Sequence, residues 1–172
     1  HSFGGLVASC VAAERPDLVS ALVLIDPALR IDTSTASEIL QLPLSWKSLE
    51  DARQGYRKAL EPSTVDEGMR WFESSWKADW RGVSLSVQAE AVRAAVDAMV
   101  MEPFDRRVFS GPTLVVIPER GRLISPRAER LAEENHSTVT TVRGCHDVAW
   151  SVPDEAAAAI SRFLIEVGLG RA

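Results

Sequence analysis

The stretch that decides the fold is the first 27 residues, HSFGGLVASCVAAERPDLVSALVLIDP (1–27). A serine flanked by small residues comes first, and apolar positions at helical spacing then predict a helix over residues 3–14. Residues 21–26, ALVLID, follow as an unbroken apolar run that ends in a charge. Such a run suits a strand buried on both faces, as in a parallel sheet. A serine turn, a helix and a buried strand therefore open the chain.

Two more stretches have the character of sheet strands, and helices follow them. Residues 112–117, PTLVVI, resemble the first strand, and residues 138–144, TVTTVRG, alternate more weakly. A serine–proline N-cap predicts a helix over residues 125–135. A last helix is predicted over residues 154–167, with one apolar stripe made of Ile160, Phe163, Leu164 and Val167. This alternation implies an α/β fold with a parallel sheet flanked by helices.

The middle of the chain has a different character. It shows no strand-like run, and residues 48–51 and 64–67 fit the capping-box pattern that opens helices. A third helix is expected over residues 86–99. Four of the five tryptophans lie here, and large aromatics at helical spacing suit either a lid core or substrate contacts: Trp46, Trp71, Trp76 and Trp80. We therefore expect three parts, a core at 1–28, an all-helical cap at 29–108 and a core at 109–172.

Composition limits the classes of partner. The 172 residues carry 19 basic and 24 acidic side chains, a net charge of −5, which argues against nucleic acid or an anionic membrane surface as main partner. No run of about 18 apolar residues occurs, so no membrane span is expected. Cys10 and Cys145 form no disulfide or zinc spacing and are expected to be small buried hydrophobes of a reducing, cytoplasmic compartment. Cys10 belongs to the apolar face predicted for the first helix, with Leu6, Val7 and Val11.

The opening residues also suggest chemistry. Ser2 and Gly4, followed at once by a helix, suit a nucleophile elbow, in which the serine oxygen is exposed above the sheet. The alternative is a Ser/Gly loop that caps a helix. A serine nucleophile needs a base, and His146 lies after the third strand, at the carboxyl edge where Ser2 is also expected. His136 sits in a polar turn, and His1 is part of the elbow. A structural role for His146 is the alternative.

Five stretches together resemble the α/β-hydrolase family, in that family's order and near its spacing: HSFGG, LVLIDPA, PTLVVIPE, RLISP and RGCHDVAWSVPDEAAAAISRFL. The helical insertion lies where the family's cap usually enters. The resemblance covers only the second part of that fold, because the earlier strands and the first oxyanion loop have no counterpart. It implies that the chain is a fragment or truncation product, that the N-terminal half of the fold is its missing partner, and that the fragment alone is poorly active.

The family's usual triad acid is absent from its common place. In the loop after the strand at 112–117 the family pattern resembles G-x-x-D-P-L-V-P, and Gly121 stands where the aspartate belongs. Two carboxylates are candidate substitutes. Asp26 ends the strand next to the nucleophile's own, where some family members carry the acid, and Glu119 lies two residues before the lost position. We favour Asp26, and the third alternative is that no acid works.

The resemblance implies a serine hydrolase. Ser2 would attack a carbonyl, His146 would act as base, Asp26 would orient His146, and the backbone N–H of Phe3 would supply half of an oxyanion hole. An aromatic-rich lid favours a small ester, thioester, lactone or similar carbonyl substrate with an apolar group. The alternatives are a non-catalytic ligand-binding relative and an inactive truncated fragment. No cofactor and no metal are expected, because the sequence shows no metal-ligand cluster and no phosphate-binding glycine loop.

Overall fold

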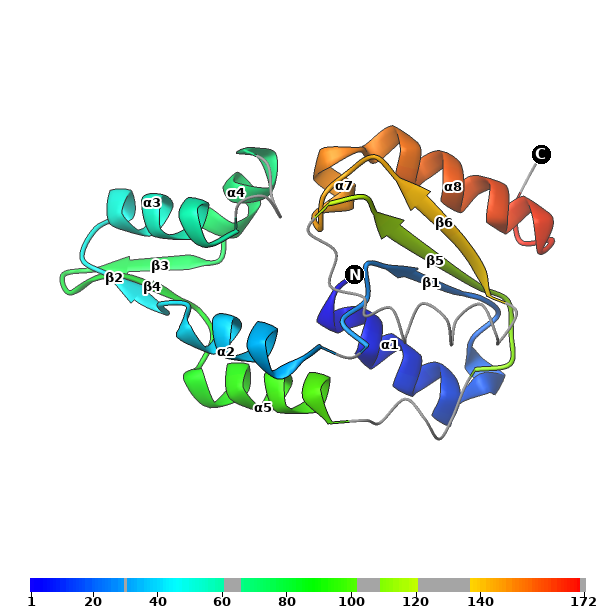
Figure 1. Cartoon of the computed structure of the whole chain (residues 1–172), viewed down its shortest axis with the longest axis horizontal. Coiled ribbons are helices and arrows are strands. Elements are labelled where there is room, and N and C mark those ends of the chain that lie inside the picture. Colours follow the sequence, from blue (N-terminus) through cyan, green and yellow to red (C-terminus); the bar gives the residue numbers. More distant parts are fainter. Residues whose placement is uncertain (30, 61–65, 102–108, 121–136, 171–172) are drawn as a thin grey trace.

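The computed structural model describes residues 1–29, 31–60, 66–101, 109–120 and 137–170. Figure 1 shows two lobes, an α/β core and an insertion that leaves the core after the first strand and returns before the second. The core elements are α1 (Phe3–Glu14), the 3₁₀ turn η1 (Pro16–Leu18), β1 (Leu22–Ile25), β5 (Thr113–Pro118), β6 (Thr138–Val142), α7 (Val148–Ser151) and α8 (Pro153–Glu166). The insertion contains α2 (Thr33–Gln41), β2 (Ser45–Trp46), α3 (Leu49–Leu60), α4 (Asp66–Glu73), β3 (Trp76–Asp79), β4 (Gly82–Leu85) and α5 (Ala89–Val100).

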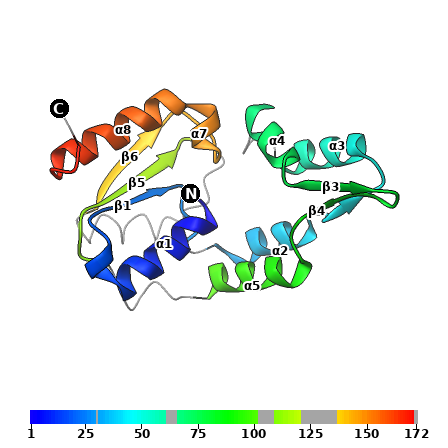
Figure 2. The ribbon, with the colours of Figure 1, turned by 180° about the vertical axis from the view of Figure 1, so that it is seen from behind.

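The core sheet is parallel, in the order β1-β5-β6. Both views of the ribbon place α1 on one face of this sheet and α8 on the other (Figures 1 and 2). Each predicted core strand is found within two residues of its expected bounds, and the first and last helices lie where the apolar pattern puts them. The fold is thus the predicted α/β architecture of a parallel sheet between helices.

Strand β5 explains why a continuous apolar run forms the centre of such a sheet. Its side chains alternate between the two faces, as in any strand, yet residues 114–118 are all buried. Val115 and Ile117 pack with residues of α1 and β1, whereas Leu114 and Val116 pack with residues of α8. The predicted stripe of the last helix is confirmed, since Phe163 is buried in that second cluster and Ile160, Leu164 and Val167 pack against it.

The buried face of α1 differs from the predicted one. The helix buries Gly5, Leu6, Ser9 and Ala12, whereas Val7 and Val11 are 47% and 49% exposed and Cys10 is exposed. Small residues face the sheet because the helix approaches it closely: a Cβ on Gly5 would lie 2.7 Å from Pro27 Cβ. The prediction that both cysteines are buried is therefore wrong for Cys10 and right for Cys145, which is 1% exposed.

The insertion is not all-helical, so that part of the prediction is wrong. Strands β2, β4 and β3 form an antiparallel sheet in that order, beside α3 and α4, and α2 packs against α5. The sequence pattern does not reveal these strands, because they are two to four residues long and Val83 alone among their residues is buried. A two-residue turn, Trp80-Arg81, joins β3 to β4. Gly82, at φ 133°, follows it in a conformation that only glycine adopts readily.

Aromatic side chains form the centre of the insertion. The rings of Trp46, Tyr56 and Trp76 lie within 5.9 Å of one another, centroid to centroid. Trp80 is different, since it is 89% exposed at the tip of the hairpin. Trp46 and Trp76 thus match the lid-core interpretation. The side chain of Trp71 lies outside the described residues.

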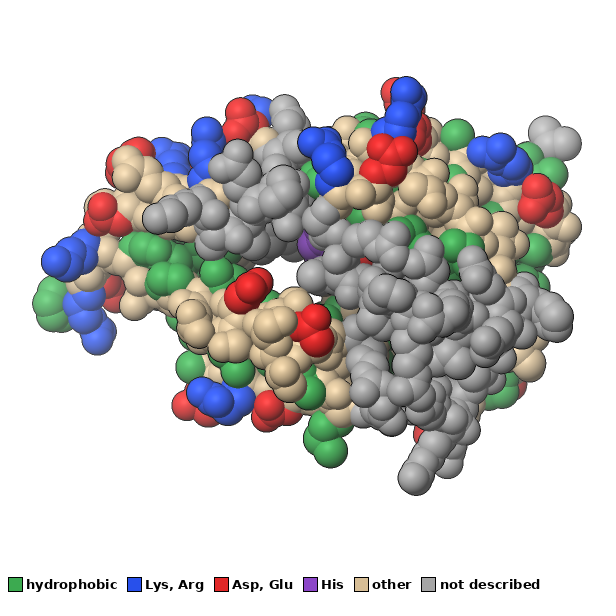
Figure 3. All heavy atoms as spheres, in the orientation of Figure 1, with side chains coloured by type: hydrophobic (Ala, Val, Ile, Leu, Met, Phe, Trp, Pro, Cys, Tyr) green, Lys and Arg blue, Asp and Glu red, His purple; other side chains and the backbone are tan. Residues whose placement is uncertain are grey.

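Among the described residues, the contacts between the two lobes include α5 with α1 and α4 with α7. Between these contacts the surface is hollowed, and a histidine side chain, purple in Figure 3, is visible at the edge of the hollow. The helix predicted over 125–135 and the capping box at 64–67 fall outside the described residues. Within the described part of the chain no helix is long and apolar enough to cross a membrane.

Candidate active site

Ser2 occupies a strained turn at the start of α1. Its backbone has φ 53° and ψ −131°, a combination that a residue with a Cβ rarely adopts. Backbone hydrogen bonds hold it there: the Ser2 N–H donates to the Ile25 carbonyl, and the Ser2 carbonyl accepts from Gly5 and Ala28. Strain of this kind persists only where surrounding contacts enforce it, and it is concentrated at functional sites. The turn at Ser2 is therefore tied to the carboxyl end of β1.

The glycines of the turn have different roles from those expected. A Cβ on Gly4 would meet nothing within 4 Å among the described residues, whereas a Cβ on Gly5 would collide with Pro27. These contacts therefore do not require Gly4, which the elbow pattern includes, to lack a side chain. It is Gly5 whose missing side chain lets the helix approach the end of β1.

Asp26 is a completely buried carboxylate one residue after β1. Its side chain is 0% exposed, and its backbone, at φ 35°, donates its N–H to the Val116 carbonyl of the neighbouring strand. One carboxylate oxygen, Oδ2, lies 2.7 Å from Nδ1 of His146. A buried carboxylate is costly unless it is paired and hydrogen-bonded. The His146 imidazole supplies such a partner.

His146 reaches Asp26 from the loop between β6 and α7. Its side chain is 15% exposed, so one edge of the ring faces solvent. The neighbouring backbone is fixed, because Cys145 donates its N–H to Ser151 Oγ and the His146 carbonyl accepts from Val148. An ionised carboxylate only accepts hydrogen bonds. Nδ1 of His146 therefore carries a proton, and Nε2 is the ring nitrogen left for a second partner.

Glu119 comes directly after β5, the strand that pairs with β1, and it has no described contact with His146. Its side chain is exposed, and its backbone N–H donates to the Val142 carbonyl. The structure thus brings Asp26, and not Glu119, against His146. The position of the lost family acid, Gly121, lies outside the described residues.

Phe3 begins α1, directly after the serine. The first N–H groups of a helix have no carbonyl one turn earlier to accept them, so the Phe3 N–H is available to a ligand at this end. The ring of Phe3 is exposed beside it. A negatively charged oxygen at this position would also face the positive end of the helix dipole.

Sequence reasoning missed two residues of the site. The His1 ring lies 4.5 Å from the His146 ring, centroid to centroid, and its Nε2–H donates to the His146 carbonyl across 2.9 Å. Asp147 is 8% exposed. Donor atoms of His1, His146 and Asp147 lie within 4.8 Å of one another, a cluster of metal-ligand type where none was expected. The adjacent pairs His1-Ser2 and His146-Asp147 were the available signal, and only the fold joins them.

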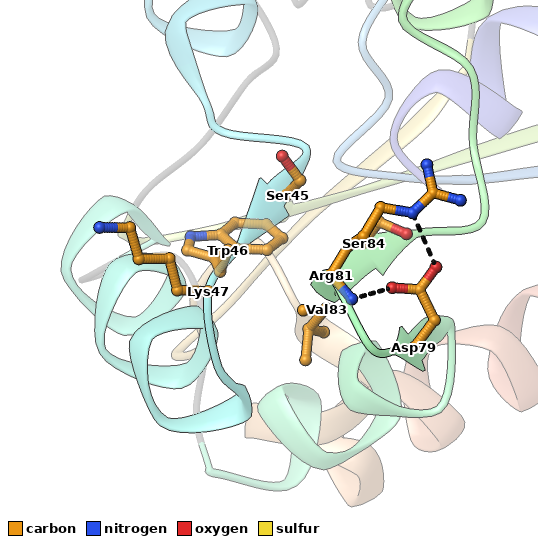
Figure 4. Close-up of a pocket in the computed structure, with 8 residues that line it drawn as sticks. Ser45, Trp46, Lys47, Asp79, Arg81, Val83 and Ser84 are labelled. Carbon is orange, nitrogen blue, oxygen red and sulfur yellow. Dashed lines mark hydrogen bonds and ion pairs between the residues drawn. The ribbon is translucent and has the colours of Figure 1, made fainter.

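A separate pocket of about 520 Å³ lies in the insertion and contains none of these residues. In Figure 4 Asp79 points toward Arg81, whose backbone N–H donates to its carboxylate across 2.7 Å. The pocket is lined by Ser45, Trp46, Lys47, Asp79, Arg81, Gly82, Val83 and Ser84. The candidate active site is therefore the edge of the core sheet, and this pocket is independent of it.

Similar proteins point to one family. Residues 1–159 match the Alpha/beta hydrolase family. Mouse sn-1-specific diacylglycerol lipase ABHD11 is 26% identical over 140 residues, which cover 73% of this chain and 44% of that protein. Lipase LipV of Mycobacterium tuberculosis is 53% identical over 45 residues, which cover 26% of this chain and 17% of that protein. The chain thus spans less than half the length of these two relatives.

Solved structures agree in fold. E-2-(acetamidomethylene)succinate hydrolase superposes with a TM-score of 0.76 at 21% identity, over 96% of this chain and 65% of that one. A marine microorganism esterase superposes with a TM-score of 0.67 at 18% identity, over 95% of this chain and 68% of that one. At such identities the likeness concerns the fold alone. With the family match over most of its length, the chain belongs to the alpha/beta hydrolase family.

Proposed function

We propose that the chain is a serine hydrolase whose site is formed by Ser2, His146 and Asp26. One observation carries the proposal: a buried carboxylate holds the imidazole across 2.7 Å, at the point where β1 is also bonded to the Ser2 turn. Ser2 pairs with the carbonyl of Ile25 and the N–H of Ala28, on either side of Asp26. A nucleophile, a base and an orienting acid are the parts that acyl transfer requires.

The proposed reaction gives each of these residues one role. Ser2 Oγ attacks the carbonyl carbon while its proton moves to His146 Nε2, and the carbonyl electron pair moves onto the oxygen. The tetrahedral intermediate then expels the alcohol, which takes the proton from His146, and an acyl-serine forms. Water repeats the sequence, giving its proton to His146 and releasing the acid and free Ser2. Asp26 stabilises the protonated imidazole in both halves.

The N-terminus of α1 suits the oxygen of the intermediate. The Phe3 N–H is the proposed donor, since the residue after the nucleophile supplies this contact in the elbow arrangement. One such donor typically accelerates acyl transfer by about 10²–10³-fold. A second donor is expected from outside the residues named here, so slow turnover by the 172-residue chain is compatible with this function.

The proposed substrate is an ester, thioester, lactone or similar carbonyl compound with an apolar group. The exposed ring of Phe3 beside Ser2 offers an apolar contact for the acyl or alcohol side. Relatives with the names lipase and esterase favour the same class. The insertion is proposed to act as a cap over this site.

Labelling with a fluorophosphonate tests the proposal directly. The probe phosphonylates an activated serine, and peptide mapping by mass spectrometry identifies the residue. We expect labelling at Ser2, loss of labelling in Ser2→Ala, and unchanged labelling in Ser20→Ala, a matched exposed serine. Labelling at another serine would overturn the assignment.

The second candidate is a non-catalytic ligand-binding relative, favoured by the missing family acid at Gly121. The same experiment separates the two. A folded chain that binds an apolar ester without being labelled by the probe would support the binding role and contradict the hydrolase.

A further inference from the structure

The candidate active site also contains a cluster of three metal-ligand side chains, of which the proposed ester hydrolysis uses only His146. His1, His146 and Asp147 each offer a donor atom within 4.8 Å of the other two. His1 lies 145 positions before His146 in the sequence, and the fold places the two rings against each other. Two imidazoles and a carboxylate are the donor set that zinc commonly takes in proteins.

One ring nitrogen of each imidazole donates a hydrogen bond to an oxygen atom of the protein. His1 Nε2 bonds to a backbone carbonyl, and His146 Nδ1 bonds to the Asp26 carboxylate. Since these oxygens only accept, the protons lie on those two nitrogens. In the neutral form of each ring, His1 Nδ1 and His146 Nε2 are the nitrogens that can bind a metal. The tautomers that a metal needs are therefore already set.

Asp147 supplies an independent observation. Its side chain is 92% buried, the complement of its 8% exposure, beside the two rings. It opens α7 without capping it, because no side-chain hydrogen bond from Asp147 to the helix forms. A cation held between this largely buried carboxylate and the two imidazoles would offset its negative charge.

The Asp26–His146 pair completes the arrangement from behind. Metal-binding histidines almost always donate their other ring N–H to a carboxylate or carbonyl, which fixes the ring and raises its basicity. His146 has this partner in Asp26 at 2.7 Å, and His1 has a carbonyl partner at 2.9 Å. The contacts that orient a base thus also orient a zinc ligand.

We propose that Zn²⁺ binds to His1, His146 and Asp147 and thereby inhibits the enzyme reversibly. The metal takes the Nε2 lone pair of His146, so that the nitrogen cannot accept the proton of Ser2. Binding itself depends only on the three ligands, and the inhibition rests on the proposed function.

The ligands must move closer together to bind one metal ion. Tetrahedral donors on one Zn²⁺ at bond lengths of about 2.0–2.2 Å lie roughly 3.3–3.6 Å apart, whereas the three donor atoms lie within 4.8 Å of one another here. His1 is exposed, which leaves its ring room to rotate toward the other two. His146 keeps its place on Asp26 during this movement.

Calorimetric titration of the chain with ZnCl₂ in a non-chelating buffer tests the binding. We expect one site, and we expect His1→Gln and Asp147→Asn each to weaken it about tenfold or more. Two matched variants, His136→Gln and Asp154→Asn, should bind as the unchanged chain does. Asp147→Glu keeps a carboxylate and should restore part of the affinity. Circular dichroism checks that each variant is folded.

A separate control addresses the α-amino group of His1, whose pKa is lowered by partial burial. A chain extended by Gly-Ser at its N-terminus has an amide there, and we expect it to bind Zn²⁺ equally well. Affinity lost on extension would place the metal on the α-amino group of His1. Unchanged affinity in Asp147→Asn would exclude the Asp147 carboxylate as a ligand. Either result would overturn the proposal.

The inhibition is measured as the rate of fluorophosphonate labelling at Ser2. Saturating Zn²⁺ should lower that rate about tenfold or more, the same order as the loss of one catalytic contact, and EDTA should restore it. Normal labelling at saturating Zn²⁺ would refute the inhibition alone. A chain that binds Zn²⁺ but is never labelled would instead refute the hydrolase function.

Discussion

The Asp26 carboxylate is fully buried and lies 2.7 Å from Nδ1 of His146. Replacing it by the amide keeps the shape but offers an N–H or a neutral oxygen to Nδ1, which destabilises the protonated imidazole. We expect Asp26→Asn to lower the rate of ester turnover or probe labelling by up to about 10⁴-fold, the cost of the same change in a well-studied triad.

Glu119→Gln is the matched control for that experiment. Glu119 is exposed, and its side chain has no described contact with His146. The rate should therefore change little. If the two variants behaved the other way round, Glu119 would be the acid, and if both were as fast as the unchanged chain, no acid would assist His146.

Ser2 provides a prediction about stability. Its positive φ of 53° disfavours any side chain, and such strain costs about 1–3 kcal/mol. We expect Ser2→Gly to have a higher free energy of unfolding than Ser2→Ala by about 1 kcal/mol, because part of the relief is lost to the greater freedom of glycine in the unfolded chain.

Urea denaturation measures this difference. The pair Ser20→Gly and Ser20→Ala serves as reference, and there the glycine variant should be the less stable. The same order at both positions would show that the Ser2 turn stores no strain.

Single residues also mark what the sequence could and could not predict about the site. Asp26 could be chosen over Glu119, because Asp26 ends the strand expected beside the one leading to Ser2, whereas Glu119 follows a strand further out. The contact with His146 agrees with that expectation, and its catalytic role stays a prediction. His1 and Asp147 could not be found, because the ring contact of His1 with His146 joins residues 145 positions apart.

At the scale of elements, the packing of α1 on β1 makes a sharp prediction. A Cβ on Gly5 would lie 2.7 Å from Pro27 Cβ and 3.2 Å from Pro27 Cα, in a backbone that cannot easily move. We expect Gly5→Ala to lower the free energy of unfolding by about 1–3 kcal/mol, the usual cost of overpacking.

Gly4→Ala is its neighbour and control. The added methyl group would meet nothing within 4 Å among the described residues, and alanine favours helix by up to about 1 kcal/mol. This variant should be as stable as the unchanged chain or slightly more stable in thermal unfolding. Equal losses at both positions would contradict the close approach of α1 to Pro27.

The elements differ in how visible they are in the sequence. The core strands are predictable because a strand buried on both faces must be apolar throughout, as in β5. Strands β2, β3 and β4 are not, because each has two to four residues and is held by its register with a neighbour and by the turn before Gly82. The buried face of α1 is also not predictable from hydrophobicity alone. Val7 and Val11 are apolar but exposed, because small residues face the sheet and set its distance from the helix.

At the scale of the whole molecule, several exposed or half-buried carboxylates favour the charged form in the fold. Hydrogen bonds lower the pKa of each below its ordinary value: from Arg15 to Asp17, from the Thr35 backbone to Asp32, from Arg53 to Glu73 and from the Arg143 backbone to Glu155. A lowered pKa means that the unfolded chain binds more protons in acid. The stability they contribute is present above about pH 4 and is lost as the pH falls below it.

Urea denaturation at a series of pH values, from about pH 3 to about pH 7, measures that loss of stability. We expect the free energy of unfolding to decline on the acid side of the range and Glu155→Gln to flatten the decline. A profile that does not change with pH would show that these contacts form equally in the unfolded chain.

The pairing of β1 with β5 closes a long loop in the chain, since Ile25 lies beside Val116 and the whole insertion is between them. The chain entropy of closing a flexible loop grows only with the logarithm of its length, so that doubling the loop costs about 0.6 kcal/mol. Most of the entropic cost of bringing Asp26 near His146 is therefore incurred at the first closure, whatever the insertion contains. The insertion can lengthen, shorten or be exchanged for another at small thermodynamic cost, while the edge that carries the candidate site keeps its geometry.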